Sequence, residues 1–418
     1  MRIFRRKPDY GYYSSYNSRR RLRVDRAVIV GGVAAILVIG IIVYFNFNRI
    51  QFLFKGYSWS TTSEIIRSFD DIEEKELLSH DEMKHILNWV DNSNKVALYD
   101  DYERFYKLHK ELSYEDTVEV VDYIFQNLAP TLKDMGYSEK TIWSLLEDGA
   151  GKSDLQYLVD NKLSNSQTLP FRKIKGYNLK KINDYITKYN EVKDYQYAVN
   201  IINYPFIISS NGNPTNAKYN IANPNDYLTL VKKGFYLNDY EPDDLVEFEE
   251  KYVAPTCDHP QLRKKAADAL MEMIKDAKKE DMHLLLNSGY RSYDEQVKIY
   301  NETKEKYGEL YASEYVATPG ASEHQTGLGI DMTAQSVVDK QRLVFGDTEE
   351  YKWVVKNCAK YGFIVRFTEG TDGITGISHE PWHLRYVGKD VAKVITNNKW
   401  TLEEYCLYNT VIPKFKKD

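Results

Sequence analysis

Cysteine is scarce in this chain of 418 residues, and the pattern of the few cysteines excludes one class of extracellular fold. The three cysteines, Cys257, Cys358 and Cys406, are an odd number and form no C-x-x-C pair. We therefore do not expect a scaffold held together by disulfides. The chain is too long for one ordinary core, and its length predicts two or three domains.

Charge is absent from residues 27–45, a run of 19 residues that is long enough to cross a bilayer as a helix. A buried core helix or a cleaved signal peptide would show a similar run. However, this run is longer than a typical signal core, and no small-residue A-x-A site follows it. We therefore predict an uncleaved transmembrane anchor at residues 27–47.

Acidic residues are rare before this run. Residues 1–26 hold nine Arg and Lys against two Asp, a net charge of +7. A basic arm can bind nucleic acid, but beside an apolar span it is better explained by the excess of positive charge on the cytoplasmic side of membrane proteins. We predict a cytoplasmic tail at residues 1–26, no nucleic-acid partner, and a single-pass cell membrane protein whose remaining chain lies outside the cell.

Residues 55–210 repeat themselves. The triplet GYS occurs at residues 56–58 and again at residues 136–138, a period of 80, and apolar residues recur within each copy at helical spacing. Ser58 and Ser138 stand where a helix N-cap would be useful. We predict an all-α region of two tandem repeats, which could be a spacer, a wall-binding module or a partner-docking arm.

Asn, Gly and Pro are dense at residues 211–225. We place a linker at residues 211–234, followed by a second domain at residues 235–413. In that domain, residues 261–279 read as an amphipathic helix, and its apolar stripe consists of Ala266, Ala267, Leu270, Met273 and Ile274.

The stretch SHEPWHLRYVG contains H-E-x-x-H at residues 379–383. In a zincin, His379 and His383 would lie on one helical face and bind zinc, with the glutamate as general base. Pro381 stands inside the motif and opposes a helix, and the following residues are rich in aromatic and β-branched types, which indicates a strand. Glu403 is a candidate third ligand, but the further Gly and His of a metzincin are absent. We treat the zincin motif as accidental.

A different ligand set is available upstream, in ASEHQTGLGIDMT. His324 and Asp331 are separated by a segment with two glycines, Gly327 and Gly329, where the backbone can bend or approach a ligand closely. Together with His383 they make a three-ligand zinc set that leaves a fourth position open for water, as a catalytic site requires.

Three stretches then carry a specific resemblance. SGYRS at residues 288–292, SEHQTGLGID at 322–331 and EPWHLRYVG at 380–388 resemble the signature blocks of the VanY-like D-alanyl-D-alanine carboxypeptidases, zinc peptidases of the cell wall that are related to L,D-carboxypeptidases. YEPDDLV at residues 240–246 resembles the usual start of that domain. One departure is Gly329, where the family usually has alanine; this residue is no ligand.

The resemblance implies the roles of several residues. Zn²⁺ would be bound by His324, Asp331 and His383, and Glu380 would take a proton from the zinc-bound water. Arg291 would polarise the substrate carbonyl and stabilise the oxyanion, although without the family a structural salt bridge would be the simpler role. The remaining candidates would bind substrate: Tyr290, Gln296, Ser322 and Trp382. For Trp382 we favour a place in the core over stacking on substrate.

The resemblance also implies the fold and the reaction. The expected domain is α+β, with an antiparallel sheet, helices on one side and zinc in a groove, as in DD-peptidases and Hedgehog-like domains. Its substrate would be the terminal D-alanine of a peptidoglycan stem peptide. L,D-carboxypeptidase or endopeptidase activity, or a non-catalytic wall-binding role, are the alternatives. The S-x-x-K and K-T-G motifs of serine D,D-carboxypeptidases occur nowhere in the chain.

Overall fold

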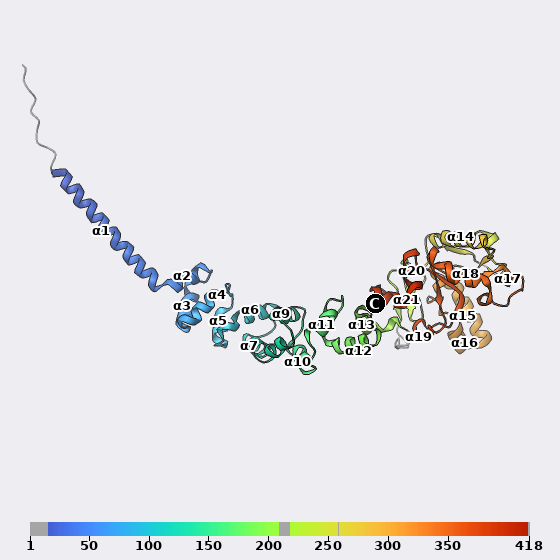
Figure 1. Cartoon of the computed structure of the whole chain (residues 1–418), viewed down its shortest axis with the longest axis horizontal. Coiled ribbons are helices and arrows are strands. Elements are labelled where there is room, and N and C mark those ends of the chain that lie inside the picture. Colours follow the sequence, from blue (N-terminus) through green and yellow to red (C-terminus); the bar gives the residue numbers. More distant parts are fainter. Residues whose placement is uncertain (1–15, 209–217, 258, 417–418) are drawn as a thin grey trace, which may run out of the picture. The chain divides into compact units, whose positions relative to one another are not determined.

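The computed structural model describes residues 16–208, 218–257 and 259–416 (Figure 1). The chain divides into two compact units, Met1–Asn165 and Ser166–Asp418. Residues 1–15 of the predicted cytoplasmic tail and residues 211–217 of the predicted linker lie outside the described part.

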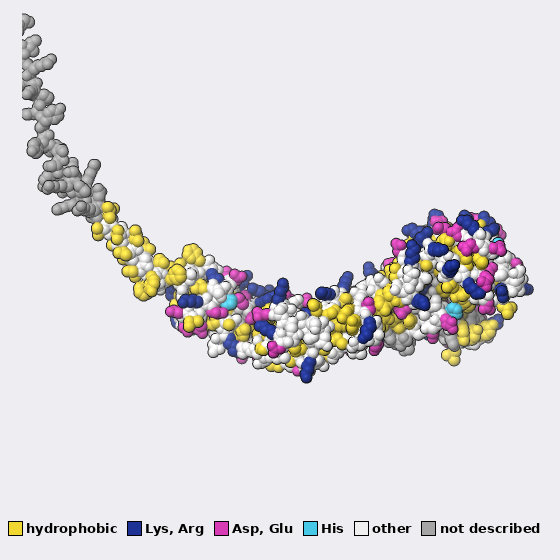
Figure 2. Space-filling view, viewed as in Figure 1, with side chains coloured by type: hydrophobic (Ala, Val, Ile, Leu, Met, Phe, Trp, Pro, Cys, Tyr) yellow, Lys and Arg dark blue, Asp and Glu magenta, His cyan; other side chains and the backbone are white. Residues whose placement is uncertain are grey.

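The first helix, α1 (Tyr16–Phe45), contains the apolar run. Its segment Val28–Phe45 is long and apolar enough to cross a membrane, with a mean hydropathy of 2.8. Hydrophobic side chains cover this segment and face solvent in the structure (Figure 2). A membrane anchor and a signal sequence near the N-terminus both have this length and composition.

The rest of the first unit is helical, as the sequence predicts. Short helices follow one another with brief turns: α2 (Phe47–Phe54), α3 (Trp59–Ser68), α4 (Asp71–Ser79), α5 (Ile86–Asn92), α6 (Tyr99–Leu108), α7 (Tyr114–Asp122), α8 (Ala129–Asp134), α9 (Glu139–Glu147) and α10 (Lys152–Asp160). A π-helical turn, Tyr123–Leu128, joins α7 to α8.

The GYS triplets adopt the same local structure at both positions. Ser58 and Ser138 cap α3 and α9, and each hydroxyl accepts a hydrogen bond from the backbone N–H three residues later, which confirms both predicted caps. The buried hydroxyl of Tyr57 accepts from the backbone N–H of Met83, and that of Tyr137 donates to the backbone oxygen of Leu163. Each partner lies 26 residues downstream. This likeness agrees with a duplication, which itself stays a prediction.

The second unit begins with helices that the sequence assigns to the repeat region: α11 (Asn165–Arg172), α12 (Ile182–Val192) and α13 (Tyr195–Asn203). In α13, Tyr197 and Ile201 share a hydrophobic core with Leu402 and Leu407 of α21 (Leu402–Asn409). The amide of Asn200 donates to the backbone oxygen of Leu407 at 2.6 Å. This long-range packing joins α13 to the C-terminal domain.

A four-stranded sheet forms the centre of the second unit, with the order β5-β6-β8-β7 and antiparallel pairing throughout. The strands are β5 (Leu284–Ser288), β6 (Gly329–Ala334), β7 (Phe363–Phe367) and β8 (Glu380–Tyr386). The smaller strands form two pairs, β1 (Tyr219–Asn220) with β2 (Phe235–Tyr236), and β3 (Leu245–Glu247) with β4 (Gln261–Arg263). The helices along this part of the chain are α14 (Lys264–Lys279), α15 (Tyr293–Tyr307), α16 (Glu309–Tyr315), α17 (Gln335–Val338), α18 (Glu349–Asn357), α19 (Asp372–Thr375) and α20 (Lys389–Asn398).

The expected amphipathic helix is α14, and all five residues of its predicted stripe are buried. Its predicted start is wrong by three residues. Residues 261–263 form β4, because their backbone pairs with β3 instead of continuing the helix. A partner strand from elsewhere in the chain thus overrides local helix preference.

Strand alternation sorts the side chains of the sheet onto two faces. Ile330, Met332 and Leu384 pack in the core that contains α14. Asp331 and His383 stand next to these residues in their strands, so they point to the opposite face. The polar face therefore carries the candidate site, and the apolar face carries the main core.

Candidate metal centre and active site

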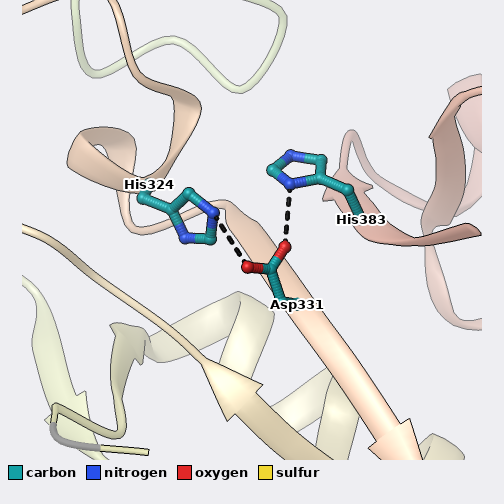
Figure 3. A group of neighbouring side chains, drawn as sticks. All are labelled: His324, Asp331 and His383. Atoms are coloured by element: carbon teal, nitrogen blue, oxygen red, sulfur yellow. Dashed lines mark hydrogen bonds and ion pairs between the residues drawn. The ribbon is translucent and has the colours of Figure 1, made fainter. Parts of the chain in front are cut away.

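Three side chains from separate elements converge on the polar face of the sheet (Figure 3). Asp331 on β6 is the register partner of His383 on β8. His324 lies in a 3-10 turn, Glu323–Thr326, which ends at Gly327 with φ of +65°. A side chain at Gly327 would be strained, and its Cβ would lie 2.8 Å from Cγ of Arg263. The glycine thus allows the tight return of the chain from His324 into β6.

The ligand atoms are close together and shielded from solvent. Nδ1 of His383 lies 3.0 Å from Oδ1 of Asp331, and Nε2 of His324 lies 3.4 Å from Oδ2 of the same carboxylate. All three potential ligand atoms are within 4.8 Å of one another. His324 and His383 are 7% and 4% exposed. The structure thus brings together the three predicted ligands.

The other nitrogen of each imidazole faces an acceptor. Nδ1 of His324 donates to the backbone oxygen of Gly289 at 2.8 Å, so the nitrogen that faces Asp331 is Nε2. Nε2 of His383 faces Oε2 of Glu323 at 3.5 Å, which leaves Nδ1 toward Asp331. Two imidazole nitrogens and a carboxylate oxygen are a donor set that suits zinc, so these residues fit the ion that the resemblance implies.

Electrostatics at the centre favour an ionised aspartate. Burial alone would raise the pKa of Asp331, but the charge and hydrogen bonds of His324 and His383 outweigh it and hold the pKa well below the usual range. A permanently charged carboxylate is the form that binds a cation.

Glu380 begins β8 and lies at an irregularity in the sheet. Phe367 pairs with Glu380, and Val365 pairs with Leu384. Between these two pairs β7 advances by two residues and β8 by four, so β8 contains extra residues here. The extra chain lies between Glu380 and Leu384, and irregularities of this kind change the direction of side chains, as bulges do. Burial raises the pKa of Glu380, the charges of Asp331 and Glu323 raise it further, and His383 lowers it. Glu380 is therefore electrostatically coupled to the metal centre.

Arg291 follows β5 in the loop that leads to α15. Its backbone N–H donates to the carbonyl of His324 at 3.3 Å, so this loop is fixed directly to the turn that carries a ligand. The guanidinium donates to Oε1 of Gln296 at 3.1 Å and to Oγ of Ser288 at 3.2 Å. Arg291 is partly exposed, and these two hydrogen bonds hold its side chain.

The four predicted substrate-binding residues differ in exposure. Tyr290, Gln296 and Ser322 are buried, and Gln296 holds both the Arg291 guanidinium and the backbone oxygen of Ala317. Trp382 is 38% exposed, although the sequence favours a core position for it. It lies in the irregular part of β8, where the strand leaves regular pairing. Substrate contacts by these residues stay predictions.

The zincin alternative has neither its helix nor its third ligand. H-E-x-x-H begins in the loop before β8 and continues in that strand, so His379 and His383 cannot share a helical face. His379 turns Nδ1 to the backbone oxygen of Phe367 at 2.9 Å. Glu403 is fully buried and accepts both terminal nitrogens of Arg366, at 3.0 and 2.7 Å.

A buried group of charges lies beside the centre and was not predicted from the sequence. Glu323, which directly precedes the ligand His324, is 5% exposed and contacts Arg366 and Arg385. These two charges outweigh the effect of burial, with help from His383, and hold the pKa of Glu323 well below its usual range. In the sequence, the only local sign of this group is a charged residue next to a ligand. The arginine partners of Glu323 lie on strands that are distant along the chain.

Comparison with known proteins agrees with this geometry. A family model described as VanY, D-alanyl-D-alanine carboxypeptidase, matches residues 259–389. The chain is 48% identical over 192 residues to the putative carboxypeptidase YodJ of Bacillus subtilis (strain 168), across 44% of this chain and 68% of that protein. It is 36% identical over 181 residues to the bifunctional D-Ala-D-Ala dipeptidase and D-Ala-D-Ala carboxypeptidase VanXYC of Enterococcus gallinarum, across 43% of this chain and 92% of that protein.

A solved structure of a mutant of the vancomycin-resistance D,D-pentapeptidase VanY, in complex with Zn(II), is 29% identical to this chain. The match covers 43% of this chain and 98% of that one, with a TM-score of 0.37. The two curated relatives and the family model confirm the resemblance that the sequence blocks carry. The chain belongs to the family of VanY-like D-alanyl-D-alanine carboxypeptidases.

Proposed function

We propose that this protein is a membrane-anchored, extracellular zinc carboxypeptidase that removes the C-terminal D-alanine from peptidoglycan stem peptides. The observation that carries the proposal is the convergence of His324, Asp331 and His383, with Glu380 electrostatically coupled to them. The substrate class is supported by the relative VanXYC, whose name describes action on D-Ala-D-Ala.

The ion would be held by Nε2 of His324, a carboxylate oxygen of Asp331 and Nδ1 of His383. Zinc in such a site acts as a Lewis acid and lowers the pKa of water from 15.7 to about 7. The protein contributes the fixed direction of each donor, because both imidazoles are held through their second nitrogen.

Glu380 is the proposed general base. Its carboxylate takes a proton from the attacking water as the new C–O bond forms at the scissile carbonyl. It then returns that proton to the nitrogen of the departing D-alanine as the C–N bond breaks. The raised pKa of Glu380 suits both steps, since a base whose pKa lies nearer neutrality also acts as a better acid.

Arg291 is the proposed electrophile. Two of its five N–H donors are used by Gln296 and Ser288, which fixes the plane of the guanidinium and leaves other donors for substrate. A guanidinium group that is already in position stabilises the oxyanion without reorganisation during the reaction. Gln296 contributes by holding Arg291, from a buried position.

The proposed topology has residues 1–26 in the cytoplasm, the segment 27–47 in the membrane and the enzyme outside. It is supported by α1 and by the net charge of +7 before the apolar run. We propose that the helical region is duplicated. The matching turns at Tyr57 and Tyr137 support the duplication.

Mass spectrometry of stem peptides tests the activity. Full-length protein in detergent, loaded with zinc, is incubated with a pentapeptide ending in D-Ala-D-Ala and with the tetrapeptide, and Glu380→Ala serves as control. Loss of one D-alanine from the pentapeptide alone is expected. Loss from the tetrapeptide alone would indicate an L,D-carboxypeptidase. Cleavage within the peptide would indicate an endopeptidase, and no cleavage with zinc bound would contradict the enzyme.

A further inference from the structure

Glu323 occupies an unusual position beside the metal centre. It adjoins the ligand His324 in the chain, yet its carboxylate extends to the other ligand, His383. Its side chain is 3% exposed, so water does not solvate the charge. A carboxylate that is buried in this way requires charged or hydrogen-bonding partners.

Two arginines on the sheet provide those partners at one of its oxygens. Oε1 accepts Nε–H of Arg366 at 2.9 Å and lies 2.8 Å from Nη1 of Arg385. Arg366 is held from its other end by Glu403, and Arg385 donates to the backbone oxygens of Tyr227 and Thr229. The carboxylate of Glu323 is therefore fixed in position and orientation.

The second oxygen is directed at the ligand. Oε2 of Glu323 lies 3.5 Å from Nε2 of His383. Within the described residues, neither atom has any other hydrogen-bond partner. Two buried polar atoms that face each other, one a donor and one an acceptor, complete each other's hydrogen bonding after a small adjustment.

Stability alone is a poor explanation for this group of charges. Buried ion pairs often contribute little or nothing compared with apolar side chains of similar size, because both partners lose their hydration. Orientation of a ligand is a better explanation, since carboxylates that accept the free N–H of a ligating histidine fix its tautomer and strengthen it as a donor.

We propose that Glu323 is a positioning residue of the metal centre: it accepts Nε2–H of His383 and thereby holds Nδ1 toward the metal. This rests on the proposed zinc site, but not on the identity of the substrate. Arg366 and Arg385 keep the carboxylate in place, whereas Glu403 contacts Arg366 and, in the hydrogen bonds of the described residues, neither Glu323 nor His383.

Zinc affinity tests the proposal. Competition with a chromophoric chelator is measured on full-length protein in detergent for the wild type, Glu323→Gln and Glu403→Gln. Both variants remove one negative charge from the same buried group, but only the first touches His383. We expect zinc binding about 10- to 100-fold weaker for Glu323→Gln, and little change for Glu403→Gln at a similar loss of thermal stability. Equal effects of the two variants, or unchanged affinity in Glu323→Gln, would overturn the proposal.

A measurement on the wild type stands even if a variant fails to fold. Long-range ¹H–¹⁵N correlations of the histidine side chains are recorded on zinc-loaded protein labelled with ¹⁵N-histidine. One ligating histidine is expected to be protonated at Nε2 and metal-bound through Nδ1. If both ligating histidines bind zinc through Nε2, the proposal is wrong. A wild type that binds no zinc would instead contradict the proposed function itself.

Discussion

Asp331 and His383 are register partners on adjacent antiparallel strands, and Oδ1 of the first lies 3.0 Å from Nδ1 of the second. Directly opposed residues have Cβ atoms about 4.5–5.5 Å apart, so the sheet itself sets the separation of these two ligands. Only His324 comes from a turn. Strand pairing therefore sets the separation of two of the three ligands, Asp331 and His383.

Replacement of His324 by alanine is expected to abolish stoichiometric zinc binding, because two ligands hold zinc much more weakly than three. The measurement is zinc content after dialysis, by atomic absorption. His379→Ala is the matched control, since His379 faces the backbone oxygen of Phe367 and not the centre. Loss of zinc in the control would support zinc binding by the H-E-x-x-H motif instead.

Glu380→Gln is expected to lower kcat by roughly 10²- to 10⁴-fold, the usual contribution of a general base. Zinc content is expected to stay at the wild-type level, because Glu380 is not one of the clustered ligands. The kcat values are measured by steady-state kinetics on the pentapeptide at saturating zinc. An unchanged kcat in this variant would show that Glu380 is not the general base.

The pH profile should reflect the raised pKa of Glu380. A base must be ionised to act, so activity falls as the pH decreases through its pKa. Since that pKa is raised above the ordinary 4.5, the acid limb of kcat/KM is expected above this value. The profile is measured with excess zinc, and zinc content is checked at each pH. An acid limb at or below 4.5 with zinc retained would contradict the assignment.

Arg291→Lys keeps the positive charge and removes the planar fork. A fall in kcat/KM on the order of 10²-fold is expected, as for the loss of an oxyanion donor. Gln296→Ala should cause a smaller fall, because it releases the guanidinium without removing it. Lys298→Ala, at an exposed lysine on the same helix, is the control. If kcat/KM of Arg291→Lys is close to that of the wild type, Arg291 has a structural role and is not the electrophile.

Local sequence could predict those features that depend on neighbouring residues. Pro381 and the β-branched and aromatic residues around it predicted β8 and excluded a zincin helix. The apolar spacing at residues 266–274 predicted α14, and Ser58 predicted a cap. The ligand set followed from donor chemistry and from the family blocks, and the structure brings its three members together.

Features that depend on distant partners could not be predicted in this way. Gln261 lies in a strand because β3 pairs with it. Glu323 has a role only through Arg366 and Arg385, which β7 and β8 bring to it. Gln296 is buried and donates to the backbone oxygen of Ala317, a contact 21 residues away in the chain. In each case long-range packing decides the environment.

The most direct test of the account is the position of the metal, from anomalous scattering at the zinc edge in crystals of the zinc-loaded protein. If the three residues bind zinc as proposed, one strong peak is expected about 2.0–2.2 Å from Nε2 of His324, a carboxylate oxygen of Asp331 and Nδ1 of His383. A peak bound by His379, or no peak among these three residues in protein that binds zinc, would contradict it.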